Sequence, residues 1–201
     1  MRKFKKVKIT PRQKQIIIGK ILGDGHLETN NGLTYRLRIE HGQKQKNYVF
    51  WLYQELENLA AGPPRLKIRK GKNGTVEKKW WFNTVSTISL RFYAQQFYQE
   101  GKKVVPRLIH RWLTPLTLAI WFMDDGSVKA KNCRCRLLNT QAFDEVSLKR
   151  LQAALKRNFD LETKLRQQKE GKQIYIPAGE YDKFKKIVQS YVLPEFEYKL
   201  G

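Results

Sequence analysis

Two carboxylates, each placed between a long apolar segment and a glycine, are the residues of this sequence best suited to chemistry. Asp24 follows an apolar segment that ends at Gly23, and Asp125 follows the almost wholly apolar segment 116–123. If these segments are helices, both acids stand at carboxyl ends, where a negative charge opposes the helix dipole. A buried carboxylate without a compensating charge costs several kcal/mol. The pattern therefore predicts a cation at both acids, and hard carboxylate oxygens favour Mg²⁺.

The two acids belong to two similar halves of the sequence. A Thr-Pro pair precedes each apolar segment, at 10–11 and 114–115, and this pair favours a helix start because threonine caps and proline tolerates the first turn. The same order of segments follows each: helix, two strands, helix, two strands, helix. We interpret this as an internal duplication, with repeats over 1–105 and 106–201. The expected fold is α+β, two pseudo-symmetric αββαββα units with antiparallel sheets, in which paired helices bring both acids side by side.

Further elements are expected inside each repeat from hydrophobic periodicity and turn residues. Pro194 is expected to end the last helix, and Asp144 is expected to cap the helix before it. Gly19 and Gly23, four residues apart, would permit a close helix crossing. Helices are expected over 48–59, 88–98, 144–159 and 180–191, and strands over 34–40, 65–70, 78–85, 163–166 and 173–177, with a further strand that carries Arg134 and Arg136 on one face.

The composition points to a polyanionic partner. Lys and Arg number 40 against 18 Asp and Glu, which gives a net charge of +22. This balance argues against an ordinary enzyme of small molecules and favours nucleic acid. A merely solvated basic surface is the alternative.

Basic residues recur at alternate positions of the expected strands, in matching places in both repeats. Such positions share one face of a strand, and a sheet face that carries Arg and Lys fits the major groove of DNA. The residues assigned to this surface are Arg36, Arg38, Arg65, Lys67, Arg69, Lys78, Lys129, Arg134, Arg136, Lys164 and Arg166.

The remaining residues limit other classes of function. The two cysteines, Cys133 and Cys135, lack a second pair for a zinc site and are expected to be reduced. His26, His41 and His110 show no ligand spacing. No apolar segment approaches the roughly 18–20 residues that span a bilayer, so no membrane partner is expected. The basic amino terminus has no apolar core typical of a secretion signal.

The two acid motifs resemble a known family. IIGKILGDG at 17–25 and LAIWFMDDG at 118–126 are similar to the paired signatures of LAGLIDADG homing endonucleases of the single-chain, two-motif type. The likeness extends over most of the chain, through YQEGKKVVP (98–106), WLTPLTLAIWFMDDG (112–126), LLNTQAF (137–143), QIYIP (173–177) and YVLPEFEYKL (191–200).

This resemblance implies specific roles for the motif residues. Asp24 and Asp125 would be metal ligands, helped by the backbone carbonyls of Gly23 and Asp124. Lys103 and Lys199 would be active-site lysines that organise solvent, although both could instead be ordinary phosphate contacts. The family also implies that each repeat lays its sheet into the major groove. The expected cofactor is Mg²⁺, with Mn²⁺ as a substitute.

The expected function is a site-specific, metal-dependent endonuclease. It would act as a monomer and cleave double-stranded DNA across the minor groove of a long asymmetric site. One alternative is an intron RNA maturase on the same scaffold; another is a DNA-binding protein without catalysis, which the presence of both acids and both lysines disfavours. The likeness to intron-encoded proteins suggests an organelle, chloroplast or mitochondrion, and otherwise a prokaryotic cytoplasm.

Overall fold

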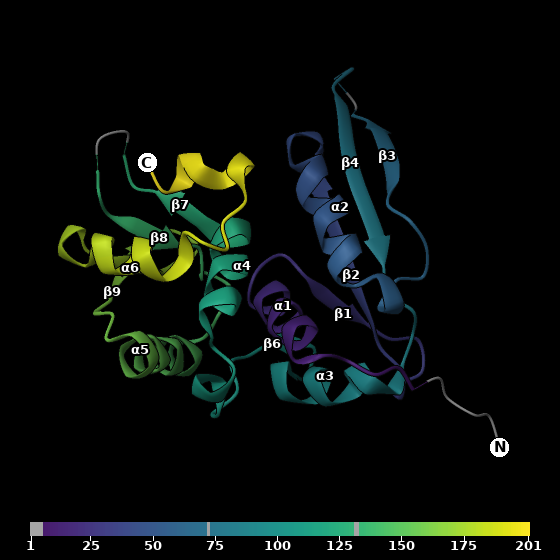
Figure 1. The fold of residues 1–201 in the computed structure, drawn as a ribbon, viewed down its shortest axis with the longest axis horizontal. Coiled ribbons are helices and arrows are strands. Elements are labelled where there is room, and N and C mark those ends of the chain that lie inside the picture. Colours follow the sequence, from purple (N-terminus) through teal and green to yellow (C-terminus); the bar gives the residue numbers. More distant parts are fainter. Residues whose placement is uncertain (1–5, 72, 131–132) are drawn as a thin grey trace.

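Two helices lie side by side at the centre of the molecule (Figure 1). The structure is a computed structural model that describes residues 6–71, 73–130 and 133–201. The central helices are α1 (Pro11–Leu22) and α4 (Pro115–Asp125). Thr10 and Thr114 cap them as expected, each accepting a hydrogen bond from a backbone N–H of the first turn. The two apolar segments of the motifs are therefore helices that pack on one another.

A four-stranded antiparallel sheet flanks each central helix, to the right of α1 and to the left of α4 in Figure 1. The first has the order β1-β2-β4-β3 and contains β1 (His26–Glu28), β2 (Arg36–Gly42), β3 (Arg65–Lys70) and β4 (Val76–Asn83). The second has the order β7-β8-β10-β9 and contains β7 (Gly126–Val128), β8 (Arg136–Leu138), β9 (Lys164–Gln168) and β10 (Gly171–Ile176). The matching strand orders confirm the α+β fold with two similar repeats.

Further helices lie beside the central pair in each repeat, and they follow the predicted order. They are α2 (Lys46–Glu55), α3 (Arg91–Phe97), α5 (Glu145–Phe159) and α6 (Tyr181–Val188). A small hairpin, β5 (Tyr98–Gln99) with β6 (Lys102–Lys103), follows α3. Asp144 caps α5 as predicted.

The predicted end of the last helix is wrong. Pro194 does not end the last helix: α6 already ends at Val188, and Pro194 begins a 3₁₀ segment over Pro194–Lys199. Proline fits there because the first helical position needs no N–H donor. This segment carries Lys199 back to the carboxyl end of α4.

The hydrophobic core is continuous across both repeats. It passes from Leu37 and Phe82 of the first sheet, through Ile17 and Ile120 of the central helices, to Ile174 of the second sheet. The crossing is close, because a Cβ added to Gly19 would lie 2.6 Å from the Ile120 Cβ. Within the described residues, no helix is long and apolar enough to cross a bilayer.

Candidate active site and nucleic-acid interface

The two predicted acids meet at the carboxyl ends of α1 and α4, but in different surroundings. Asp24 lies just beyond Gly23, the C-cap of α1, and half of its side chain is exposed. Asp125 is the last residue of α4. Burial, together with the negative charges of Asp24 and Asp124, raises the pKa of Asp125 to about 7. The nearby cations thus compensate the charge of Asp125 incompletely, and two hard carboxylates in this state are a donor set that fits a divalent metal ion.

Each of the two predicted lysines contacts the backbone at the carboxyl end of the central helix of its own repeat. Lys103 Nζ, from β6, donates hydrogen bonds to the carbonyl oxygens of Gly23 (2.9 Å) and Gly25 (3.2 Å). Lys199 Nζ donates to the carbonyl oxygens of Met123 (2.6 Å) and Asp124 (3.4 Å). Burial lowers the pKa of both ammonium groups, while the nearby aspartates raise it.

The Asp124 side chain points away from the acid pair, into the protein. Its carboxylate is fully buried and forms an ion pair with Lys20 Nζ at 2.7 Å. It also accepts hydrogen bonds from the Tyr48 hydroxyl at 2.9 Å and from the Asp24 N–H at 3.0 Å. The side chain is therefore occupied by protein partners.

His41 was missed by sequence reasoning, although it lies beside the acids. One ligand atom from each of Asp24, His41 and Asp124 falls within 4.8 Å of the others, as at a metal centre. However, Lys20 Nζ lies 2.7 Å from His41 Nε2, and Gln45 Oε1 lies 3.2 Å from Nδ1. Burial and then the positive charge of Lys20 lower the pKa of His41 to about 3.

The Lys20 ammonium group therefore supplies the cation of this trio, and His41 is neutral with both ring nitrogens engaged. The only sequence signal for this cluster was Lys20 itself, a charged residue inside an apolar helix segment. Lysine is almost never fully buried unless it is paired.

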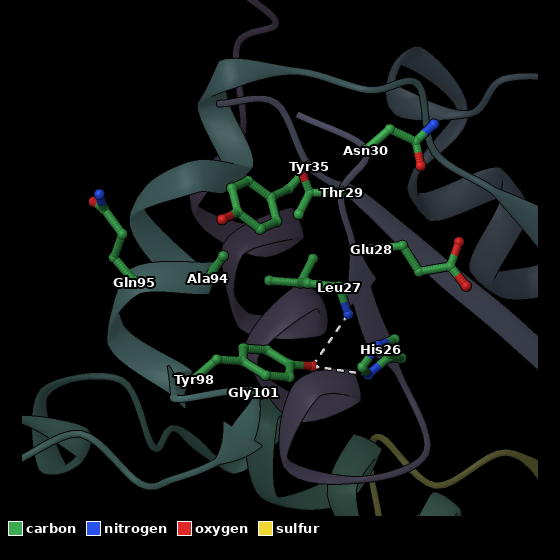
Figure 2. Close-up of a pocket in the computed structure, with 10 residues that line it drawn as sticks. All are labelled: His26, Leu27, Glu28, Thr29, Asn30, Tyr35, Ala94, Gln95, Tyr98 and Gly101. Atoms are coloured by element: carbon green, nitrogen blue, oxygen red, sulfur yellow. Dashed lines mark hydrogen bonds between the residues drawn. The ribbon is translucent and has the colours of Figure 1, made fainter. Parts of the chain in front are cut away.

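Two cavities lie on the side of the first sheet, and Asp24 lines the smaller one. One, of about 410 Å³, is lined by Asp24 and His41 together with Arg38, Glu40 and Lys79, so it opens the site toward the outer sheet face. The other, of about 670 Å³, lies between β1 and α3 (Figure 2). In the second cavity the Tyr98 hydroxyl accepts a hydrogen bond from the Leu27 N–H and contacts His26 Nδ1, which anchors β1 next to Asp24.

The outer face of the first sheet is basic, with carboxylates between the cations. Glu28 pairs with Arg36 and Arg38, and Glu40 lies near Arg38, Lys67 and Lys79. These partners lower the pKa of both glutamates against the opposing effect of burial. The residues on this face by register are Arg36, Arg38, Arg65, Lys67, Arg69 and Lys79.

Lys78 does not share the face to which it was assigned. It is exposed, but it pairs with Ile68 across the ladder and so lies on the opposite face from Lys67 and Arg69. Its neighbour Lys79, which was not predicted, pairs with Lys67 and lies on the outer face.

The structure contradicts the assignment of Arg136 to the outer face of the second sheet. Arg136 is 2% exposed and pairs with Ile176 on the inner face. Its guanidinium donates to the carbonyl oxygens of Cys133 (2.8 Å), Cys135 (3.0 Å) and Leu200, and it stacks on Tyr181. A shift of one residue in strand register moves every side chain to the other face of the sheet. Here Arg136 lies on the inner face, where main-chain carbonyl oxygens accept hydrogen bonds from its guanidinium group.

Arg134 was also assigned to the outer face, but its side chain is directed toward α6, as that of Arg136 is. It forms an ion pair with Asp182 and stacks on Tyr181, both at the start of α6. Lys164 and Arg166 do lie on the outer face, across from Tyr175 and Gln173, and Lys129 lies over the Tyr175 ring. The two cysteines are free, as expected.

Comparison with known proteins adds sequence and fold relatives. The model described as the LAGLIDADG DNA endonuclease family matches residues 14–184. DNA endonuclease I-ChuI of Chlamydomonas applanata is 30% identical over 96% of each chain. The cytochrome b mRNA maturase bI2 of Saccharomyces cerevisiae is 32% identical over 92% of this chain and 46% of its own length. A structure of the homing endonuclease I-WcaI bound to its DNA recognition sequence aligns with a TM-score of 0.91 and 27% identity, covering 97% of this chain and 88% of that one.

Proposed function

Because the chain belongs to the LAGLIDADG DNA endonuclease family, we propose that it is a homing endonuclease that cleaves both strands of double-stranded DNA. Cleavage would occur across the minor groove of a long asymmetric site, with the protein acting as a monomer. The observation that carries this proposal is the pair of carboxylates at adjacent helix ends, each with a lysine bound to the backbone beside it.

In this proposal Asp24 and Asp125 hold divalent metal, Mg²⁺ with Mn²⁺ as a substitute, and the backbone carbonyls of Gly23 and Asp124 assist. A bound divalent ion supplies polarisation of the scissile phosphate, activation of water and stabilisation of the departing 3′ oxygen. Lys103 and Lys199 keep the two helix ends in place and present ammonium protons to solvent near the phosphates. Their lowered pKa makes these protons easier to transfer.

The outer sheet faces would bind the DNA. Arginines on these faces suit bidentate pairing with guanine, and lysines suit phosphate contacts. Glu40, held among three cations, can accept from a cytosine amino group. Lys129, Lys164 and Arg166 provide the corresponding surface in the second repeat.

The test is selection of a cleavage site by the wild-type protein from a plasmid library that carries a randomised insert. With Mg²⁺ the protein should convert plasmids bearing the selected site to linear DNA, and EDTA should prevent this. Affinity for the selected site should fall steeply between about 50 and 200 mM salt, because phosphate contacts release counterions. Failure to enrich any sequence, or a flat salt dependence, would contradict the proposal.

A second candidate function is RNA maturation. The observation that favours it is the match to the yeast cytochrome b mRNA maturase over 92% of this chain. A basic sheet surface can also hold an RNA helix through phosphates and 2′-hydroxyls. Stimulation of splicing of the intron that encodes the protein, without cleavage of the intronless site, would favour the maturase.

We also propose that the protein is encoded in an organelle intron.

A further inference from the structure

A buried ionic cluster joins the two central helices beneath the acid pair. Lys20 of α1 and the Asp124 side chain of α4 are both 0% exposed, and their charged atoms lie 2.7 Å apart. Lys20 Nζ also donates to His41 Nε2 and lies over the Tyr48 ring, 5.2 Å from its centre. The Tyr48 hydroxyl donates to the Asp124 carboxylate. Every side chain of this cluster is thus packed against the others.

The cluster reaches the candidate metal ligand Asp24 through the backbone. Asp124 Oδ2 accepts the Asp24 N–H at 3.0 Å. The Gly25 N–H donates to the Lys20 carbonyl oxygen at 2.6 Å. Gly23 leaves no space for a side chain here, because an added Cβ would lie 2.5 Å from the Asp124 Cβ. The carboxylate of Asp124 therefore lies directly against the turn that carries Asp24.

The other acid has no such support. When the motifs at 17–25 and 118–126 are aligned, Trp121 occupies the place of Lys20, and Asp124 occupies the place of Gly23. Trp121 is fully buried, and within the described residues its indole N–H has no hydrogen-bond partner. Asp125 itself is still helical, and its carbonyl oxygen accepts the Asn139 N–H.

Stability alone does not account for the cluster. Replacing a buried ion pair with apolar residues of similar volume is often neutral or stabilising, because removing both charges from water is costly. The Lys20–Asp124 ion pair lies against the turn that carries Asp24, and Asp125 has no equivalent pair beside it. This difference points to a role in the site rather than in stability alone.

We propose that Lys20 is a positioning residue: by orienting Asp124 it fixes the backbone and carboxylate of Asp24, and not those of Asp125. This inference rests on the proposed endonuclease function. If each acid serves mainly one strand, loss of the cluster slows cleavage of the strand that depends on Asp24. The product is then a nicked circle that accumulates before linear DNA forms.

Three variants separate positioning from simple stabilisation. Lys20→Met leaves the buried Asp124 carboxylate uncompensated. Lys20→Met combined with Asp124→Ala removes both charges and also the acceptor of the Asp24 N–H. Tyr48→Phe removes only one hydroxyl and keeps the test possible if Lys20→Met does not fold. Trp121→Phe, at the position equivalent to Lys20, is the matched control for a change in the buried core of the motif helices.

The first measurement needs neither metal nor DNA. Amide exchange of the ¹⁵N-labelled protein in EDTA should show the Asp24 N–H protected in the wild type. Protection should fall at least tenfold in the Lys20 variants and less in Tyr48→Phe, while the Asp125 amide stays unchanged. Trp121→Phe should leave both amides as they are.

The second measurement uses a supercoiled plasmid bearing the site selected with the wild-type protein. The double variant should regain thermal stability relative to Lys20→Met, yet its second-strand cleavage should stay at least tenfold slower than its first. DNA affinity should change less than threefold.

Equal cutting of both strands by the double variant, or an Asp24 amide that stays protected in it, would overturn the inference. If the wild-type protein cuts no DNA, the proposed function fails, whereas the amide exchange still decides whether Lys20 positions Asp24.

Discussion

At the scale of single residues, the two acids of the site are chemically unequal. Asp24 is half exposed beyond the end of its helix, whereas Asp125 is held inside the last turn of α4 with a raised pKa. Both are nevertheless within electrostatic reach of one another and of Lys103 and Lys199. We expect both acids to be needed for cleavage, and we expect the ionisation of Asp125 to change with pH near neutrality.

Asp24→Asn and Asp125→Asn should each abolish double-strand cleavage, because a metal ligand is lost in each. DNA affinity should stay within about tenfold, roughly 1.4 kcal/mol, because the sheet contacts remain. Plasmid cleavage and fluorescence anisotropy on the same site measure the two effects. Efficient cutting of both strands by either variant would contradict the ligand assignment.

The stability of the metal-free protein should depend on Asp125 in a defined direction. Its pKa of about 7 in the folded state lies above the ordinary 3.8, so its stabilising contribution is full below about pH 4 and is lost as the pH rises through 7. Asparagine cannot ionise. Asp125→Asn should therefore gain a few kcal/mol relative to wild type between pH 5 and 8, at about 1.4 kcal/mol per pKa unit.

Thermal unfolding in EDTA at pH 5 and pH 8 tests this prediction. Glu170→Gln, at an exposed position, is the control and should shift the unfolding temperature equally at both pH values. A stability difference for Asp125→Asn that shrinks as the pH rises would contradict the raised pKa.

At the scale of elements, the close crossing of α1 and α4 and the register of the strands place the functional side chains. The crossing depends on glycines that face side chains of α4, Gly19 on Ile120 and Gly23 on Asp124. The register depends on which residues find partners on the inner face, and for Arg136 those partners are main-chain carbonyls.

Gly19→Ala should destabilise the protein. Alanine favours a helix over glycine by about 1 kcal/mol, but its Cβ would lie 2.6 Å from the Ile120 Cβ and 2.8 Å from the Thr117 carbonyl oxygen. These atoms belong to the packed partner helix, so overpacking of about 1–3 kcal/mol should exceed the gain. Gly62→Ala, where no atom lies within 4 Å of the new Cβ, is the control in thermal unfolding and should cause no loss.

Arg136→Met and Arg166→Met should have opposite effects. The first leaves buried carbonyl groups without a donor, so it should cost about 2 kcal/mol or more of stability and change DNA affinity little. The second alters an exposed outer-face residue and should weaken binding by about 1–3 kcal/mol if Arg166 contacts a base. Unfolding temperature and anisotropy titration measure both; a stable Arg136→Met protein with weakened binding would restore the original assignment.

At the scale of the whole molecule, one core and one candidate site are shared by two repeats. The core passes through the contact of α1 with α4, and the Lys20–Asp124 ion pair crosses the same contact. Each repeat contributes one acid and one lysine to the candidate site.

We propose a division at 105/106 and expect each half, 1–105 or 106–201, to be poorly soluble or to self-associate when expressed alone. Each would expose the apolar face of α1 or α4 that the other covers, and large exposed apolar patches promote aggregation. Any cleavage by a self-associated half should require a palindromic site, because two copies obey a true twofold axis. Light scattering measures the oligomeric state; soluble monomeric halves, or an obligate dimer of the full chain, would refute this.

The sequence by itself determined which two acids are the candidate site residues and the order of the elements that carry them. Thr-Pro helix starts, apolar segments and terminal acids are local patterns, and their duplication fixed the repeat architecture and brought Asp24 and Asp125 together. The lysines at 103 and 199 were found through family resemblance alone, since nothing local distinguishes them from 38 other basic residues.

Tertiary structure alone decided which charges face inward. Lys20 and Asp124 are 104 positions apart, and only the helix crossing turns them into a buried pair with His41 and Tyr48. Tertiary contacts also decide the orientation of Arg136. The alternation of side chains along a strand shows that neighbouring residues lie on opposite faces, but not which face is buried. That choice depends on the carbonyl of Leu200 and the ring of Tyr181, which reach Arg136 only when the distant carboxyl-terminal segment has folded back.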